Sequence, residues 1–265
     1  MHDISILGCG WLGLPLAKSL IEKGFSVNGS TTSEAKIPVL ENAGIHAFLI
    51  ALHAEKANGE IASFLNNSEI LIIDIPPKLR GLETESFVDK IRMLIPHIEK
   101  SAVKKVLFIS SISVYADDNS TITETFKPNA ESESGKQLAA AEQLLQSNPN
   151  FKTTILRFGG LIGADRHPVK FLAGRKNVEN PDALVNLINQ NDCIGIIEKI
   201  IELEKWNEIF NAAAPFHPTR KDYYTQKATA LNLPVPEFEQ AKSAHGKIIL
   251  STKIETLLGF HFTSI

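Results

Sequence analysis

The chain has few of the features that mark secreted, membrane or nucleic-acid-binding proteins. Its 265 residues include two cysteines, Cys9 and Cys193, too few for a disulfide framework and typical of a reducing compartment. No apolar run reaches the ~18 residues that a membrane-spanning helix requires. The net charge is -3 at pH 7, with no long run of like charge. We therefore expect a cytoplasmic protein that binds neither membranes nor nucleic acid.

Two further absences narrow the function. Met1-His2-Asp3 lead directly into an apolar segment, so the sequence predicts no signal peptide. The eight histidines show no metal-binding spacing such as H-E-x-x-H, so we expect no metal site. The remaining composition, 43% hydrophobic and 22% charged, is that of a soluble globular protein large enough for a full core.

What the sequence does contain is a glycine motif at its start. An apolar strand over 3–8 runs into Gly8, Gly10 and Gly13, and a helix pattern over 12–23 follows. This G-x-G-x-x-G spacing between a strand and a helix is typical of a dinucleotide pyrophosphate site, because main-chain amides at a helix start bind the anion. The alternative is a βα turn that binds nothing. We expect cofactor contacts from Gly8, Gly10, Trp11, Leu12 and Gly13.

Strands and helices alternate after this motif. Further strands are expected near 25–30, 46–50, 69–75, 103–110, 153–158 and 209–211, and helices near 34–43, 59–66, 84–99, 132–147 and 191–204. This order predicts an α/β protein with a doubly wound parallel Rossmann sheet. We assign residues 1–165 to the NAD(P)-binding domain and 166–265 to a small C-terminal substrate lobe, with about 191–212 returning to the sheet. The lobe is expected to hold a helix over 219–232.

The segment after the second strand bears on the choice of cofactor. NAD sites usually place a carboxylate about 20 residues beyond the glycines. Here that place holds Ser30, Thr31 and Thr32, with Lys36 nearby, so the sequence favours NADP over NAD. The hydroxyls also fit a helix cap. Ile75 and Pro76 close the fourth strand beside the expected adenosine path, or simply end it. Asp74 either caps a neighbouring loop or touches the cofactor, and we favour the cap because an isolated buried carboxylate is costly.

The segment 106–115, Val-Leu-Phe-Ile-Ser-Ser-Ile-Ser-Val-Tyr, resembles the strand-five motif of the extended short-chain dehydrogenases/reductases, also called NAD-dependent epimerase/dehydratases. Residues 122–124, 156–163, 185–192 and 258–260 resemble further motifs of that family. The resemblance implies a nicotinamide cofactor beside Ser110 and Gly159. It also implies a small polar substrate such as a nucleotide sugar, and a homodimer formed through the helices 84–99 and 132–147.

The family's catalytic residues are matched only in part. A serine at the position of Ser111 binds the reacting oxygen in that family, and a Tyr-x-x-x-Lys pair moves the proton. Alignment on Gly135 and Glu142 puts Ser134 in place of the tyrosine and a leucine, Leu138, in place of the lysine. We name Ser111, Tyr115 and Ser134 as catalytic candidates, although on an extended strand Tyr115 lies ~13 Å beyond Ser111. Tyr115 packed at the strand end is the alternative.

Two hypotheses follow. The first is an NAD(P)-dependent oxidoreductase, or a nucleotide-sugar epimerase/dehydratase-like enzyme, of a branch without the Tyr-x-x-x-Lys dyad. The second is a non-catalytic NAD(P)-binding sensor or regulatory protein that keeps the fold. The retained Ser-Ser motif favours the first hypothesis and the missing dyad favours the second. Arg157 and Arg166 are candidates for holding an anionic substrate.

Overall fold

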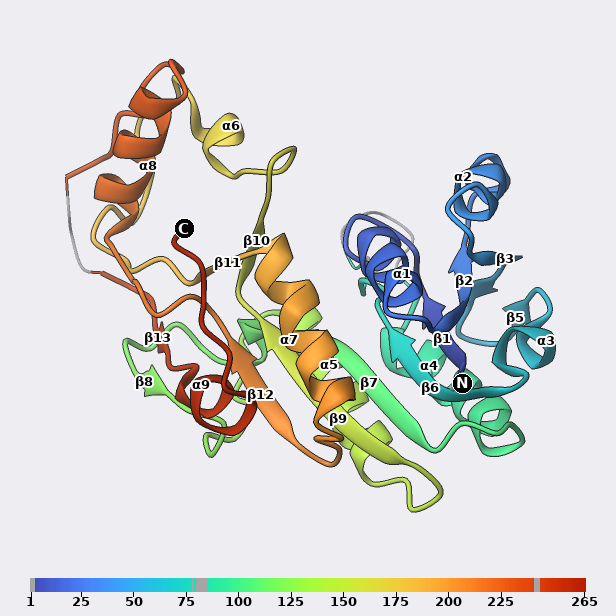
Figure 1. Cartoon of the computed structure of the whole chain (residues 1–265). Coiled ribbons are helices and arrows are strands. Elements are labelled where there is room, and N and C mark those ends of the chain that lie inside the picture. Colours follow the sequence, from blue (N-terminus) through green and yellow to red (C-terminus); the bar gives the residue numbers. More distant parts are fainter. Residues whose placement is uncertain (1–2, 78, 80–84, 241–243) are drawn as a thin grey trace.

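A computed structural model describes residues 3–77, 79, 85–240 and 244–265 (Figure 1). The sequence start Met1-His2 and the first residue of the helix expected over 84–99 lie outside the described residues. Within them the chain forms a central sheet covered on both faces, with a smaller lobe at one end of the strands (Figure 1).

The central sheet has seven strands in the order β12-β9-β7-β6-β1-β2-β3, and every neighbouring pair is parallel. Its members are β1 (Asp3–Leu7), β2 (Ser26–Thr31), β3 (His46–Leu49), β6 (Ser68–Ile73), β7 (Lys105–Ser111), β9 (Lys152–Phe158) and β12 (Ile209–Ala212). The inner strand β6 contains the buried apolar run Ile70-Leu71-Ile72-Ile73, as expected of a parallel strand whose two faces are both covered by helices. The predicted α/β fold with a doubly wound parallel Rossmann sheet is confirmed.

Two separate hydrophobic cores lie on the two faces of the sheet. One contains residues of α1 (Gly13–Glu22), α2 (Ile37–Glu41), α7 (Gln190–Glu202) and α9 (Thr252–Leu258). The other contains residues of α3 (Ile61–Leu65), α4 (Phe87–Glu99) and α5 (Glu133–Gln146). Serine caps start the last two helices, since Ser86 accepts from the Asp89 N–H and Ser132 from the Gly135 N–H.

The lobe stands at the carboxyl ends of β9 and β12 (Figure 1). It contains α6 (Val169–Leu172) and α8 (Arg220–Ala230), which share a third core. Two short parallel pairs tie it to the sheet, β10 (Gly160–Ile162) with β11 (Leu187–Asn189), and β8 (Thr121–Ile122) with β13 (Ile248–Ile249). Since β12 joins the central sheet through β9, part of the C-terminal half belongs to the sheet.

Several short elements escaped the sequence analysis. They are the hairpin β4 (Ala51–Leu52) and β5 (Ala57–Asn58), the strands β8, β10 and β11, and helix α6. Segments of two to four residues are too short to show a hydrophobic period. The helix expected over 34–43 was too long: a 3-10 turn, η1 (Glu34–Lys36), precedes α2, because Pro38 is suited only to the first turn of an α-helix.

Two searches of the described residues bear on membranes and metals. None of the helices formed by these residues is long and apolar enough to cross a membrane. Across 3–77, 79, 85–240 and 244–265, no three His, Cys, Asp or Glu side chains are grouped so that they could hold a metal ion.

Candidate functional site

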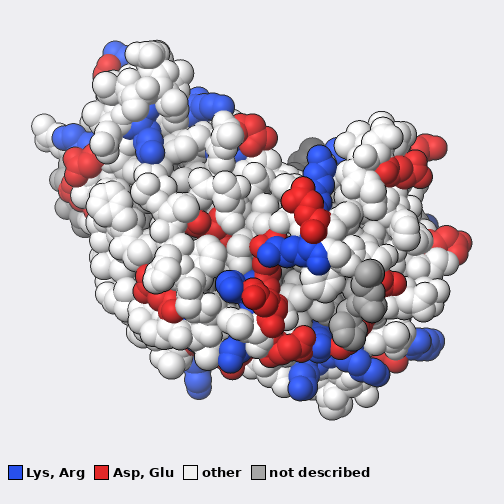
Figure 2. Space-filling view, viewed as in Figure 1, with Lys and Arg blue, Asp and Glu red and all other residues white. Residues whose placement is uncertain are grey.

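The predicted site residues follow strands that end at the same edge of the sheet. The chain runs outward from β1 to β3, then resumes on the other side of β1 at β6. Ligands of open parallel sheets bind at such a reversal of strand order, outside the carboxyl ends of the strands. Figure 2 shows the molecule hollowed between the lobe and the part that carries α1 and α2.

The three glycines of the first loop meet different surroundings. Gly8 has φ +108°, and a Cβ there would lie 2.2 Å from the Asp74 carbonyl oxygen. A Cβ at Gly13 would lie 2.3 Å from the Gly8 carbonyl oxygen. A Cβ at Gly10 would meet nothing within 4 Å. Gly8 and Gly13 are therefore required for the close packing of loop, strand and helix, whereas Gly10 faces open space.

Helix α1 begins directly behind this loop, and its N-cap residue, Leu12, supplies no side-chain hydrogen bond. The unpaired amides and the positive dipole end of such a helix favour an anion. Asp74, the residue directly after β6, accepts the Gly13 N–H with its carboxylate, as the sequence analysis favoured. The loop is thus fixed by one carboxylate and left open toward the hollow.

A pocket of about 190 Å³ lies in front of this loop. It includes seven of the residues that the sequence named for the cofactor: Gly8, Gly10, Ser30, Thr31, Thr32, Ile75 and Pro76. The Ser30 hydroxyl accepts the Gly8 N–H at 2.9 Å, which joins the end of β2 to the loop. Lys36 also lines the pocket. Sequence reasoning missed Leu7, Cys9, Ile50, Leu52 and Lys90 as lining residues, because only strand order brings Ile50, Leu52 and Lys90 here.

Five other residues named for the cofactor lie elsewhere. Leu12 is in the core and Gly13 is buried as the first residue of α1. Trp11 turns toward the lobe, where its Nε1 donates to Asp165 at 2.8 Å. Ser110 is buried and its hydroxyl donates to Glu142. Gly159 lines a second pocket beyond the glycine loop.

Asp74 combines burial with a place beside the glycine loop. Burial raises its pKa from 3.8 to about 7, and the hydrogen bond from Gly13 opposes the shift. Because this pKa is raised on folding, the stability that Asp74 contributes is fully present below about pH 4. It is lost as the pH rises to about 7, while the unfolded chain already carries the charge.

We expect Asp74→Asn to flatten this dependence, since the amide cannot ionise but its oxygen can still accept the Gly13 N–H. Urea unfolding between pH 5 and 8 measures it: the wild type should lose stability toward pH 7, and the variant should lose less. Asp182→Asn, an exposed site in the lobe, is the matched control. Identical profiles for wild type and Asp74→Asn would contradict the assignment.

The second pocket, of about 330 Å³, holds Ser111. The Ser111 Oγ accepts the Ser113 N–H at 3.1 Å, so its own O–H is left to donate into the pocket. The turn after Ser111 is the 3-10 segment η2 (Ile112–Val114), held close to α5 at Gly135. A Cβ at Gly135 would lie 2.1 Å from the Ser113 carbonyl oxygen. Gly135 therefore matters for placing the Ser111 turn.

Tyr115 lies in a buried polar network and does not line this pocket. Its side chain is 2% exposed, and its hydroxyl donates to Asn211 at 3.0 Å and accepts from Arg157. Arg157 in turn binds Glu142 through Nη2 at 2.6 Å and Nε at 3.0 Å. We therefore propose a structural role for Tyr115 and Arg157, in place of the catalytic and substrate-binding roles that the sequence suggested.

The two positions of the missing dyad lie on α5. Ser134 is half-buried and is not among the residues that line the Ser111 pocket. Leu138 is 4% exposed and belongs to the core shared with α4. Ser134 thus lies outside the lining of the pocket that holds Ser111.

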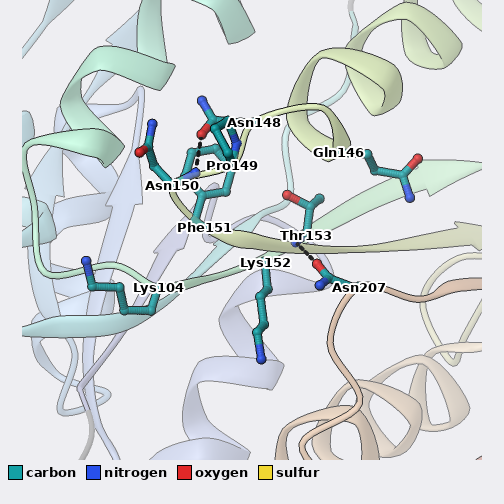
Figure 3. Close-up of a pocket in the computed structure, with 9 residues that line it drawn as sticks. All are labelled: Lys104, Gln146, Asn148, Pro149, Asn150, Phe151, Lys152, Thr153 and Asn207. Atoms are coloured by element: carbon teal, nitrogen blue, oxygen red, sulfur yellow. Dashed lines mark hydrogen bonds between the residues drawn. The ribbon is translucent and has the colours of Figure 1, made fainter.

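A further depression, of about 550 Å³, lies at the opposite ends of the strands (Figure 3). It is formed by the chain around the start of β9, between Asn148 and Thr153. The Asn150 N–H is bound by Asn148 and the Thr153 N–H by Asn207, as Figure 3 shows. It lies far from the glycine loop, so we do not place the function there.

Comparison with known proteins agrees with this geometry. The model of a family described as NAD(P)H-binding matches residues 8–185, which include the glycine loop, Ser111 and Gly159. The chain belongs to this NAD(P)H-binding family. It is similar to Protein YeeZ of Escherichia coli K12, at 34% identity over 264 residues, covering 99% of this chain and 96% of that protein. A UDP-glucose 4-epimerase of Dictyostelium discoideum is 25% identical over 201 residues, 69% of this chain and 58% of the epimerase.

The chain is also similar in fold to several solved structures. A putative NAD-dependent epimerase/dehydratase from Methylobacillus flagellatus has a TM-score of 0.81 and 24% identity, covering 98% of this chain and 93% of that one. MoeE5 in complex with UDP-glucuronic acid and NAD has a TM-score of 0.81 and 15% identity, covering 100% and 95%. The predicted resemblance to NAD-dependent epimerase/dehydratases is confirmed.

Proposed function

We propose that the protein is an NADP-dependent oxidoreductase, or an epimerase/dehydratase-like enzyme acting on a small polar substrate such as a nucleotide sugar. The observation that supports it most is the Ser111 hydroxyl, which is free to donate into a pocket at the same sheet edge as the glycine loop. The chemistry that a bound nicotinamide would supply is hydride transfer. Ser111 would hold the reacting oxygen, and water or another side chain would move the proton.

The choice of a nucleotide sugar rests on relatives. The similar Dictyostelium protein is a UDP-glucose 4-epimerase, and MoeE5 was solved with UDP-glucuronic acid. A similar fold does not by itself identify the substrate, because function depends on the residues of the site. The homodimer through α4 and α5 likewise stays a prediction.

A test of activity uses reduced cofactor and a panel of sugar nucleotides and small carbonyl compounds, followed by the absorbance of reduced nicotinamide. We expect Ser111→Ala to slow a substrate-dependent change by about 10- to 100-fold, the loss of one hydrogen bond to the reacting oxygen. Ser63→Ala, which removes an exposed hydroxyl on α3 outside both pockets, is the control. Equal rates in wild type and Ser111→Ala would contradict the role of Ser111.

The preference for NADP rests on Lys36, which lines the cofactor pocket together with Ser30, Thr31 and Thr32. A cation and hydroxyls suit a 2′-phosphate, whereas a carboxylate would suit the free ribose of NAD. We expect Lys36→Glu to weaken NADP binding by about tenfold and to leave NAD binding equal or tighter. Calorimetric titration with both cofactors measures it, with Lys18→Glu, exposed on α1, as the control for charge. Unchanged NADP affinity in Lys36→Glu would contradict the proposed preference for NADP over NAD.

The second candidate function is a non-catalytic NADP-binding sensor. The observation in its favour is Leu138, which packs in the core where the family's dyad lysine would stand. If the protein binds NADP and no compound of the panel changes nicotinamide absorbance, the result favours the sensor over the enzyme.

A further inference from the structure

The Ser111 pocket lies where the sheet meets the lobe, and its lining is positively charged. β7 and the loop after β9 supply Ser111 and Gly159, while the lobe supplies Arg220 and Tyr224. The charged lining residues are Asp117, Arg220 and Lys247, so two cations face one carboxylate. A pocket with one excess positive charge favours an anionic ligand.

The carboxylate is already paired. Lys247 is only 8% exposed, and its Nζ lies 3.0 Å from the Asp117 carboxylate and donates to the Tyr115 carbonyl at 2.6 Å. The Asn186 side chain holds the backbone at and just after Lys247, donating to the Lys247 carbonyl and accepting the Ile249 N–H. Lys247 therefore acts as a fixed part of the pocket wall, with its charge balanced by Asp117.

Arg220 lacks such a balance. Its Nε is buried without a hydrogen-bond partner, and no carboxylate of the described residues forms an ion pair with it. Its guanidinium lies 5.7 Å from the centre of the Tyr224 ring, which orients it but accepts no strong hydrogen bond. A buried N–H of a charged group that finds no acceptor is costly, so it needs an explanation.

The other two arginines considered for the substrate do not serve this pocket. Arg157 is neutralised by Glu142 inside the buried network. The Arg166 guanidinium lies 5.0 Å from the centre of the Trp11 ring, and Arg166 does not line the Ser111 pocket. Arg220 is thus the cation in this pocket whose charge is free for a ligand.

We propose that Arg220 binds a carboxylate or phosphate of the substrate whose reacting oxygen meets Ser111. This rests on the proposed function in taking the Ser111 pocket as the substrate pocket. A planar guanidinium can bind either group through two parallel hydrogen bonds, and in doing so it would satisfy the orphaned Nε. The substrate class is then narrowed from small polar compounds to those with an anionic group near the reacting carbon.

The experiment measures thermal stabilisation by inorganic phosphate and by malonate, against chloride at equal ionic strength. The glycine loop can bind the same anions, so all variants carry Gly10→Asp, which blocks it. We expect a saturable stabilisation in the Gly10→Asp background that Arg220→Gln weakens at least tenfold and Arg220→Lys weakens less. Lys221→Gln, an exposed neighbour on α8 with the same loss of charge, should behave as its parent. If phosphate stabilises the protein more than malonate, the substrate's anionic group is a phosphate. If malonate stabilises it more, the group is a carboxylate.

Two outcomes would overturn the proposal: stabilisation that is equal in the parent and Arg220→Gln, or none beyond chloride in the parent. Titration of Arg220→Gln alone with NADP separates this failure from that of the proposed function. NADP binding as in wild type shows a folded protein with an intact cofactor site. If the wild type itself shows no saturable NADP binding, the proposed function is contradicted. The result on anion binding by Arg220 is then still valid.

Discussion

Gly10→Asp is expected to abolish measurable NADP binding while leaving the protein folded. A Cβ at this position would have no other atom within 4 Å, so the folded protein accommodates the new residue. The side chain would enter the space in front of the α1 N-terminus, where a diphosphate would lie. Steric overlap and like charge together should cost at least ~100-fold in affinity, about 3 kcal/mol. Calorimetric titration measures the affinity, and urea unfolding checks the fold.

Two further variants distinguish a direct effect on NADP binding from a loss of folding. Gly10→Ala adds a methyl group without charge and should lose less affinity than Gly10→Asp. Gly13→Ala should instead destabilise the protein, because its Cβ would lie 2.3 Å from the Gly8 carbonyl oxygen. NADP affinity in Gly10→Asp equal to that of the wild type would show that the diphosphate does not bind at this loop.

The buried ion pair of Glu142 and Arg157 should carry the largest effect on stability. Both side chains are nearly inaccessible, at 2% and 3% exposure, and Arg157 also binds Tyr115. Glu142→Ala leaves the arginine charge buried without its partner and takes the acceptor from Ser110. Removing one member of such a pair costs about 3–5 kcal/mol. We expect the free energy of unfolding in urea to fall by this amount.

The matched control replaces both members, as Glu142→Met with Arg157→Met. No uncompensated charge then remains, so the double variant should recover much of the loss. Lys199→Met with Glu202→Met, an exposed pair on α7, should change stability little. A loss below about 1 kcal/mol in Glu142→Ala would contradict the structural role of this network.

Much of the fold could be predicted because its signals are local. The glycine spacing, the apolar strands and the alternation with helices lie within short windows, and each follows from backbone geometry and burial. The same holds for Ser30, Thr31 and Thr32, which lie at or directly after the end of β2 and line the pocket in front of the glycine loop because β2 pairs with β1. The short strands β8, β10 and β11 could not be predicted, since a pair of two or three residues forms only when the rest of the fold is in place.

The sequence by itself determined the parallel sheet, the glycine loop and the residue types at its edge. The tertiary structure decided which of those side chains remain free to act. Arg157 and Arg220 are alike as residues, but Glu142 neutralises the first and no described carboxylate pairs with the second. Lys247 reaches the Tyr115 carbonyl from 132 positions away. The physical reason is that a polar side chain's charge and hydrogen bonds depend on its neighbours in space, which chain order does not specify.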